Sequence, residues 1–225
     1  FMTPFGRYCF LRVPMGINVG PEEFQNKMSE TLSGLPGCQV IMDDVLIHGA
    51  TKKEHDEKLA QALRRIELSG LKLNREKCHF GQAEVSFFGH VINEKGIKAS
   101  PEKINAITQL EAPKNVAELR RMIGMINYLG RFTKNLSTLI KPLTDLLRKD
   151  VQWGWDSPQQ NAFDAVKKII SELPSLSFYD PKRHTVVSAD SSSYGLGATI
   201  LQRDDSGNLQ PIAFASRTLT PTEQR

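Results

Sequence analysis

Apolar residues fall into segments of different spacing along the first part of the chain. Residues 1–13 are aromatic and β-prone, which predicts an extended, hairpin-like segment. Apolar side chains then recur every fourth residue at Phe24, Met28 and Leu32, and this spacing predicts a helix with one buried stripe. Glycine and proline at 34–37 end that helix.

Two more elements are predicted before the middle of the chain. Residues 39–48 are apolar on both sides of Asp43 and Asp44, and predict a β-hairpin with the two acids at or near its turn. The apolar spacing from about 53 to 68 predicts an amphipathic helix, with Gly70 as its C-cap.

Helical signals dominate the middle of the chain. Residues 84–92 predict one strand, whose partner is expected just after Gly96. Capping residues and N-terminal prolines predict helix starts at Ser100-Pro101, at Asn115 with Glu118, and at Ser157-Pro158. A further short amphipathic piece is expected at 139–148.

Short β-rich segments return after Pro174. Residues 185–189, 197–202 and 210–216 predict three antiparallel strands, with Gly and Asp in the turns between them. The order is therefore mixed α/β, then helical, then a β meander. We predict an α/β (α+β) fold class, with boundaries near 97 and 150.

Charge is concentrated in the predicted helical region. The 225 residues are 40% hydrophobic, enough for one large domain or a few small ones, and the net charge is +4. Residues 98–149 hold ten Lys or Arg against four Asp or Glu, a local charge of +6, and the flanking regions are near neutral. Such a segment is typical of a surface that binds a phosphate backbone; a solvated helical face is the alternative.

Cysteine usage and hydropathy argue against several classes of protein. Cys9, Cys38 and Cys78 are far apart and form no metal-binding pattern, which fits a reducing compartment, cytoplasmic or nuclear. There is no signal peptide and no apolar run of about 18 residues, so secretion and membrane spanning are not expected. The start at Phe1 and a helix start just before Arg225 indicate a fragment or a processed product.

The paired acids Asp43 and Asp44 are the sharpest candidate for chemistry. Adjacent carboxylates in an apolar run repel each other, and burial would increase that cost. A divalent cation would offset it: Mg²⁺ prefers oxygen ligands, and two such ions can activate a 3′-hydroxyl and stabilise a leaving pyrophosphate. A solvent-exposed, Asp-rich turn is the alternative.

Six blocks of the sequence, in order and with matching spacing, resemble the reverse transcriptases of gypsy-like long-terminal-repeat retrotransposons. They are residues 3–25 (nucleotide pocket and template grip), 41–44 (the Tyr-x-Asp-Asp signature), 70–80 (a palm motif), 87–92 (the primer grip), 115–149 (the thumb) and 153–216 (the start of the linked RNase H-like domain). The resemblance implies a partial right-hand polymerase fold, with the fingers and palm remainder in 1–97, helical thumb and connection in 98–150, and the N-terminal part of an RNase H-like domain in 151–225.

The same resemblance implies a function and partners. Members of the family are RNA-directed DNA polymerases with a linked RNase H. The resemblance implies nucleotide transfer with two bound Mg²⁺ ions, with Mn²⁺ as the alternative metal. The implied partners are an RNA/DNA primer–template and dNTPs. Homodimerisation is left open, and no membrane partner is expected.

Residue roles carry over at the matching positions. Asp43 and Asp44 would be two of the three metal-binding carboxylates of the palm, and Asp190 would bind metal in the RNase H-like domain. Lys77 would act near the pyrophosphate as a general acid, with an ordinary surface lysine as the alternative. Gln25 would position the template, with an exposed helical glutamine as the alternative.

The remaining implied contacts lie in two short segments. Pro14, Met15 and Gly16 would shape the nucleotide pocket, while Phe88 and Gly89 would contact the primer backbone. The alternative for Phe88 is an ordinary core position. The alternative for Asp190, in the RNase H-like segment, is an ordinary turn position.

Three departures from the family pattern limit the expected activity. The third palm carboxylate belongs to a strand that precedes residues 3–25, Ile41 replaces the signature tyrosine, and further RNase H acids are expected beyond Arg225. We therefore expect the chain alone to be catalytically inactive, because metal catalysis depends on ligand number and geometry. The alternative to an enzyme segment is a catalytically dead, element-derived module that binds nucleic acid or protein, or a relic.

Overall fold

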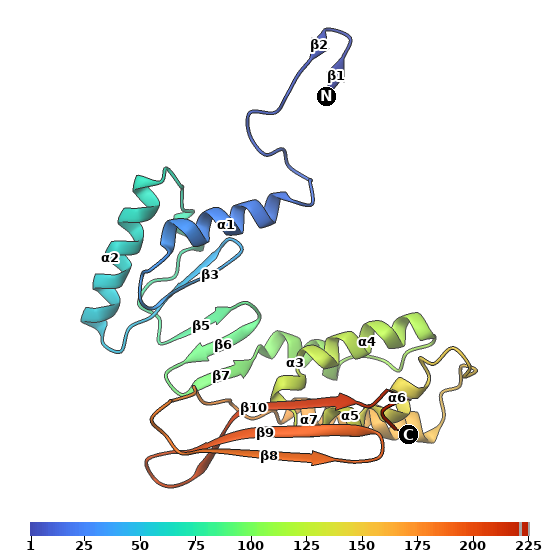
Figure 1. The fold of residues 1–225 in the computed structure, drawn as a ribbon. Coiled ribbons are helices and arrows are strands. Elements are labelled where there is room, and N and C mark those ends of the chain that lie inside the picture. The colour runs from blue at the N-terminus through green and yellow to red at the C-terminus, as the bar shows by residue number, and fades with distance from the viewer. Residues whose placement is uncertain (221, 225) are drawn as a thin grey trace. The chain divides into compact units, whose positions relative to one another are not determined.

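The chain, as a computed structural model, divides into two compact units, Phe1–Gln82 and Ala83–Arg225 (Figure 1). The structure describes residues 1–220 and 222–224. Pro221 and Arg225, which belong to the predicted RNase H-like segment, lie outside the described residues. Within 1–220 and 222–224, no helix has the length and apolar character needed to cross a membrane.

The first unit consists of two hairpins and two helices. Its elements are β1 (Met2–Thr3), β2 (Gly6–Arg7), α1 (Gly20–Leu32), β3 (Cys38–Ile41), β4 (Asp44–Ile47), α2 (Lys52–Leu68) and the 3-10 turn η1 (Arg75–Lys77). The predicted hairpin-like segment at 1–13 is confirmed in its first part only, where β1 pairs with β2. The predicted hairpin at 39–48 is confirmed, since β3 and β4 pair as antiparallel strands.

Local signals account for both ends of α2. The side chain of Thr51 accepts a hydrogen bond from the backbone N–H of Glu54, which satisfies one free donor of the first turn. Gly70 follows the helix with a φ of 71°, a conformation that glycine adopts at little cost. The predicted helix is therefore confirmed, and Gly70 ends it as the residue directly after the C-cap, Ser69.

A small apolar core holds the two helices of this unit against the β3–β4 hairpin. The buried side chains are Met28 and Leu32 of α1 with Ala62 and Ile66 of α2. The stripe predicted for α1 is wrong at its first position, because Phe24 is 42% exposed. The buried positions of α1, Met28 and Leu32, both lie in the second half of the helix. The strands β3 and β4 have four residues each.

The second unit begins with a three-stranded sheet, continues with helices and ends with a second three-stranded sheet. Its elements are β5 (Glu84–Phe87), β6 (His90–Asn93), β7 (Gly96–Ala99), α3 (Pro101–Thr108), α4 (Val116–Tyr128), η2 (Gly130–Phe132), α5 (Leu136–Leu139), α6 (Lys141–Asp145), α7 (Ser157–Ser171), β8 (Thr185–Ser191), β9 (Gly195–Arg203) and β10 (Leu209–Thr218). The three predicted helix starts are confirmed at α3, α4 and α7.

Residues 84–92 form two strands, not the single strand predicted. Phe87 of β5 pairs with His90 of β6 across a two-residue turn at Phe88 and Gly89, whose φ angles are 46° and 73°. Positive φ at both central positions matches the right-handed twist of the flanking strands. The expected partner after Gly96 is confirmed, since β7 pairs with β6.

One hydrophobic core spans most of the helical part of the second unit. It includes Leu119 of α4, Leu143 of α6 and Val166 of α7, each with 0% exposure. Helices before and after residue 150 therefore share one core. The predicted C-terminal strands form an antiparallel sheet in the order β10-β9-β8, and Phe214 of β10 packs against that core.

Candidate functional site

The two adjacent aspartates lie at the turn of the β3–β4 hairpin, as predicted. Ile41 pairs with Asp44 in the last register position, so Met42 and Asp43 form the two-residue turn. Met42 has a φ of 55°, in the left-handed region where a residue with a side chain is under strain. A strained turn keeps one shape only when its surroundings hold it.

Gln25 of α1 supplies that restraint. Its side-chain oxygen accepts a hydrogen bond from the backbone N–H of Met42, and its Nε2 donates to the carbonyl oxygen of Val40 at 3.3 Å. The same nitrogen also donates to Ser29 Oγ at 2.8 Å. The amide of Gln25 thus binds the hairpin on both sides of Ile41, a role that its sequence context did not predict. The implied template contact of Gln25 stays a prediction.

Asp43 and Asp44 are both exposed, so the burial considered from the sequence is not observed. No ion pair of the described residues neutralises either carboxylate. Their donor chemistry fits a hard divalent cation, which prefers carboxylate oxygens. They are not joined by a third acidic, His or Cys side chain, because residues 1–220 and 222–224 contain no group of three such side chains placed to hold a metal.

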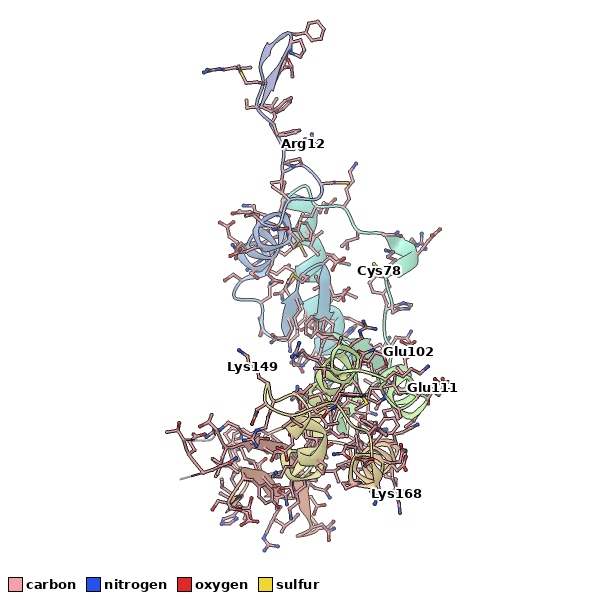
Figure 2. All side chains as sticks on the ribbon, turned by 90° about the vertical axis from the view of Figure 1, so that its right-hand side faces the viewer. Arg12, Cys78, Glu102, Glu111, Lys149 and Lys168 are labelled. Carbon is pink, nitrogen blue, oxygen red and sulfur yellow. The ribbon has the colours of Figure 1, made fainter. Side chains whose placement is uncertain are left out.

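The other candidates of the first unit lie on less constrained segments. Pro14, Met15 and Gly16 precede α1, in a segment of bends and turns that also carries Arg12 (Figure 2). The side chain of Met15 is fully exposed at 103%, and Gly16 has a φ of 85°. Lys77 ends η1 and is exposed. No hydrogen bond among the described residues links these side chains to the aspartates, so their implied roles stay predictions.

The turn at Phe88 and Gly89 is held by a helix of its own unit. The Tyr128 hydroxyl at the end of α4 donates a hydrogen bond to the carbonyl oxygen of Phe88 at 2.9 Å. The ring of Phe88 is 56% exposed, so the alternative of a plain core residue does not describe it. A Cβ at Gly89 would lie 2.6 Å from the Tyr128 hydroxyl oxygen, closer than van der Waals contact allows. With a φ of 73° as well, the position favours glycine, and a larger residue would require Tyr128 and Lys103 to shift.

Aromatic and basic side chains surround the same turn. His90 stacks on Tyr128 with 5.5 Å between ring centroids, and the amine of Lys103 lies 3.6 Å from the centre of the Tyr128 ring. Burial, with the positive charges of Arg131 and Lys103, lowers the pKa of His90 below its ordinary value. Sequence reasoning missed this grouping, because the four residues come from four elements, β6, α3, α4 and η2, and no local pattern joins them.

Asp190 is the next-to-last residue of β8 and pairs with Gly197 of β9, so it lies one residue from the end of the strand that was predicted at 185–189. The side chain is exposed, and its Oδ1 accepts a hydrogen bond from the backbone N–H of Ser191 at 2.9 Å. The described residues gather no other metal-binding side chains around it in a group of three. Its implied role as a metal ligand therefore stays a prediction.

Most charges of the basic segment at 98–149 face solvent. The exposed Lys149 is an example, and Figure 2 shows it on the same unit as the exposed Glu102 and Glu111. Lys141 is half-buried and pairs with Asp145 at 2.6 Å. The segment therefore offers several cations to a ligand in solution, as a phosphate-binding surface would require.

Two family profiles match the chain. The family described as reverse transcriptase (RNA-dependent DNA polymerase) matches residues 1–92. The family described as RNase H-like domain found in reverse transcriptase matches residues 155–225. Together the two matches contain Asp43, Asp44 and Asp190.

Similar proteins and solved structures agree with these families. The Transposon Tf2-3 and Tf2-4 polyproteins of Schizosaccharomyces pombe are each 32% identical to the chain over 225 residues. Each match includes 99% of this chain but only 17% of the polyprotein. The foamy viral protease-reverse transcriptase in complex with RNA/DNA hybrid is 25% identical, with a TM-score of 0.79 over 95% of this chain and 29% of that one. The same viral protein in complex with dsDNA has a TM-score of 0.81 at 25% identity, over 95% of this chain and 45% of that one.

Proposed function

Because the chain belongs to the reverse transcriptase and RNase H-like family of gypsy-like retrotransposon polyproteins, we propose that it is part of an RNA-directed DNA polymerase with linked RNase H. The observation that carries the proposal is the β3–β4 turn, where Asp43 and Asp44 are unpaired and a side chain of α1 holds the backbone. Pre-positioned carboxylates need no rearrangement when they meet a charged substrate.

Reverse transcriptase and RNase H-like domains generally depend on divalent metals. We propose Mg²⁺ as the metal, with Mn²⁺ as a substitute, and Asp43 and Asp44 as the residues of this chain that would hold it in the polymerase. When bound, such an ion supplies charge neutralisation at the transferring phosphate. Asp190 would be the corresponding ligand in the RNase H-like segment.

The proposed partners are an RNA/DNA primer–template and dNTPs. The support is that similar solved proteins are in complex with RNA/DNA hybrid and dsDNA, and that the 98–149 segment carries exposed cations. In this proposal the turn at Phe88 and Gly89 touches the primer backbone, the segment at Pro14, Met15 and Gly16 borders the nucleotide, and Lys77 lies near the pyrophosphate.

The proposed organisation places the palm remainder in 1–97, the thumb and connection in 98–150, and the RNase H-like domain in 151–225. The common core on both sides of residue 150 implies that the last two of these segments fold together. We propose an intracellular site of action, cytoplasmic or nuclear, on the basis of the dispersed free cysteines.

Primer extension by the polyprotein that carries this chain tests the polymerase role. Asp43→Asn and Asp44→Asn should each lower kcat by at least about a hundredfold, as removal of one positioned electrostatic group does elsewhere, while primer–template binding is kept. Glu57→Gln, an exposed and unpaired acid on α2 of the same unit, serves as the matched control and should leave kcat unchanged. Full activity in both aspartate variants would rule out the metal role.

A binding module without turnover is the second candidate function. It is favoured by Ile41 in place of the signature tyrosine, and by the lack of a three-residue metal group in the described part of the chain. In that case the same polyprotein binds primer–template with steep salt dependence but does not extend it, and the aspartate variants bind as the wild type does.

A further inference from the structure

Two cations that lack an acidic partner lie near the turn at Phe88 and Gly89: one borders Gly89 and the other acts on His90, the residue that follows the turn. Lys103 is half-buried on α3, and its amine would lie 2.8 Å from a Cβ at Gly89, so the glycine leaves room for it. Arg131 of η2 is the second cation: it is exposed, its guanidinium lies 5.7 Å from the centre of the Phe132 ring, and its charge acts on His90, the residue after the turn. Among the described residues, neither forms a salt bridge with a carboxylate. The amine of Lys103 packs on the Tyr128 ring, which offsets part of its desolvation, and Arg131 is exposed, so both keep a positive charge that a bound anion can neutralise.

His90 adds an unsatisfied polar atom to the same place. Its ring contacts two aromatic rings, those of Tyr128 at 5.5 Å and Phe132 at 5.6 Å between centroids. Its Nδ1 is buried and has no hydrogen-bond partner. Buried polar atoms are almost always paired, so an unpaired one needs an explanation such as a water molecule or a ligand.

The charges that face His90 all have the same sign. Lys103 on α3 and Arg131 on η2 are the charged groups that act on it, Tyr128 on α4 is neutral, and its strand neighbours Phe87 and Ala99 are apolar. Burial and these two cations hold the pKa of His90 below its ordinary value. An anion bound between them would reverse that effect, because an opposite charge at short range favours the protonated ring.

We propose that His90, Lys103 and Arg131 form a proton-linked site for a backbone phosphodiester, in which the phosphate neutralises both cations and His90 takes up a proton from water as the nucleic acid binds. The inference rests on the proposed function, since it takes the phosphate from the nucleic-acid partner. It adds a regulation: affinity for nucleic acid increases as pH falls through the range in which the bound histidine titrates.

The imidazole NMR signals of His90 in the full chain test the proton uptake directly. They are followed against pH without ligand, with a short RNA/DNA hybrid, and with inorganic phosphate at the same phosphate concentration. The hybrid should raise the titration midpoint of His90 by at least about one pH unit, as one opposite charge at this range does. An unchanged midpoint with bound hybrid overturns the proposal. A shift with inorganic phosphate alone means a small-anion site, and also overturns the assignment to the backbone.

Binding of the hybrid by wild type and variants separates this inference from the proposed function. Affinity should rise by up to about tenfold per pH unit between about pH 8 and pH 6, the limit for one proton taken up. His90→Gln should still bind the hybrid but should abolish the dependence of affinity on pH. The control is His184→Gln, at an exposed histidine of the same unit, which should keep the pH dependence of the wild type. If wild type binds with no slope, the inference fails and the nucleic-acid role stands. If neither the wild type nor any variant binds the hybrid at any pH, the inference and the proposed nucleic-acid role both fail.

Discussion

Two strained turns of this chain are each held by one polar side chain from a helix. Met42 and Phe88 are non-glycine residues with positive φ in two-residue turns. The family resemblance implies metal binding at the first turn and primer contact at the second. Gln25 of α1 restrains the first turn through its amide, and Tyr128 of α4 restrains the second through its hydroxyl. Backbone strain of this kind persists only where neighbouring groups over-determine it. The helices therefore set the shape of both turns.

Replacement of Gln25 tests the first restraint. Gln25→Ala leaves the Met42 N–H without its acceptor and should lower the free energy of unfolding of Phe1–Gln82 by about 1–2 kcal/mol. Urea denaturation followed by circular dichroism measures this change. Gln39→Ala, an exposed glutamine on β3 of the same hairpin, should change stability by less than about 0.5 kcal/mol. Equal effects of the two variants would show that the hydrogen bonds of Gln25 to the hairpin, here called the Gln25 clamp, contribute nothing to stability.

Glycine 89 tests the second turn, with a matched glycine elsewhere in the unit. Gly207 also has positive φ, 84°, but nothing lies within 4 Å of its missing Cβ. Gly207→Ala should therefore lose about 1–2 kcal/mol from backbone strain alone. Gly89→Ala should lose about 1–3 kcal/mol more, because its Cβ meets the Tyr128 hydroxyl and Lys103. Urea denaturation compares the two, and equal losses would mean that Tyr128 and Lys103 move aside freely.

At the scale of elements, α4 and α3 start with different qualities of cap. The Asn115 side chain accepts a hydrogen bond from the backbone N–H of Glu118 at 2.9 Å, whereas Ser100 makes no side-chain cap bond at α3. Asn115→Ala should lower unfolding free energy by about 1 kcal/mol, and Ser100→Ala by less than about 0.5 kcal/mol. Thermal unfolding of both variants measures the difference. A larger loss for Ser100→Ala would contradict this ranking.

Helix starts were predictable because capping signals are local, as Asn115 with Glu118 illustrates. The single strand predicted at 84–92 was wrong, because a Phe-Gly pair inside an apolar run is a weak turn signal and only the paired register exposes it. The position of the paired aspartates at a hairpin turn was predictable from the flanking apolar runs. The contact of Gln25 with Met42 was not, since it joins residues 17 apart on different elements.

At the scale of the whole molecule, the two units have hydrophobic cores of very different size. The core of Phe1–Gln82 is built on four buried side chains, Met28, Leu32, Ala62 and Ile66. The core of the second unit extends from Ala99 to Leu176 and joins α3, α4, α6 and α7. Apolar burial is the main favourable term in folding, so the first unit should be the less stable of the two.

Separate cores predict two unfolding transitions that different probes resolve. Both tryptophans of the chain, Trp153 and Trp155, lie in the second unit, so their fluorescence reports that unit alone. Circular dichroism reports helices of both units and should begin to change at lower urea concentration than the fluorescence does.

Two truncations in the cores assign these transitions. Leu32→Ala should destabilise the first unit by about 2–5 kcal/mol and move only the early change in circular dichroism. Leu119→Ala, at a fully buried position of the second core, should move the fluorescence transition by a similar free energy. If Leu32→Ala shifted the tryptophan transition as much as Leu119→Ala does, the chain would unfold as one cooperative body. The turn that carries Asp43 and Asp44 would then share the stability of the larger core. Under the predicted behaviour it depends on four buried side chains and the Gln25 clamp.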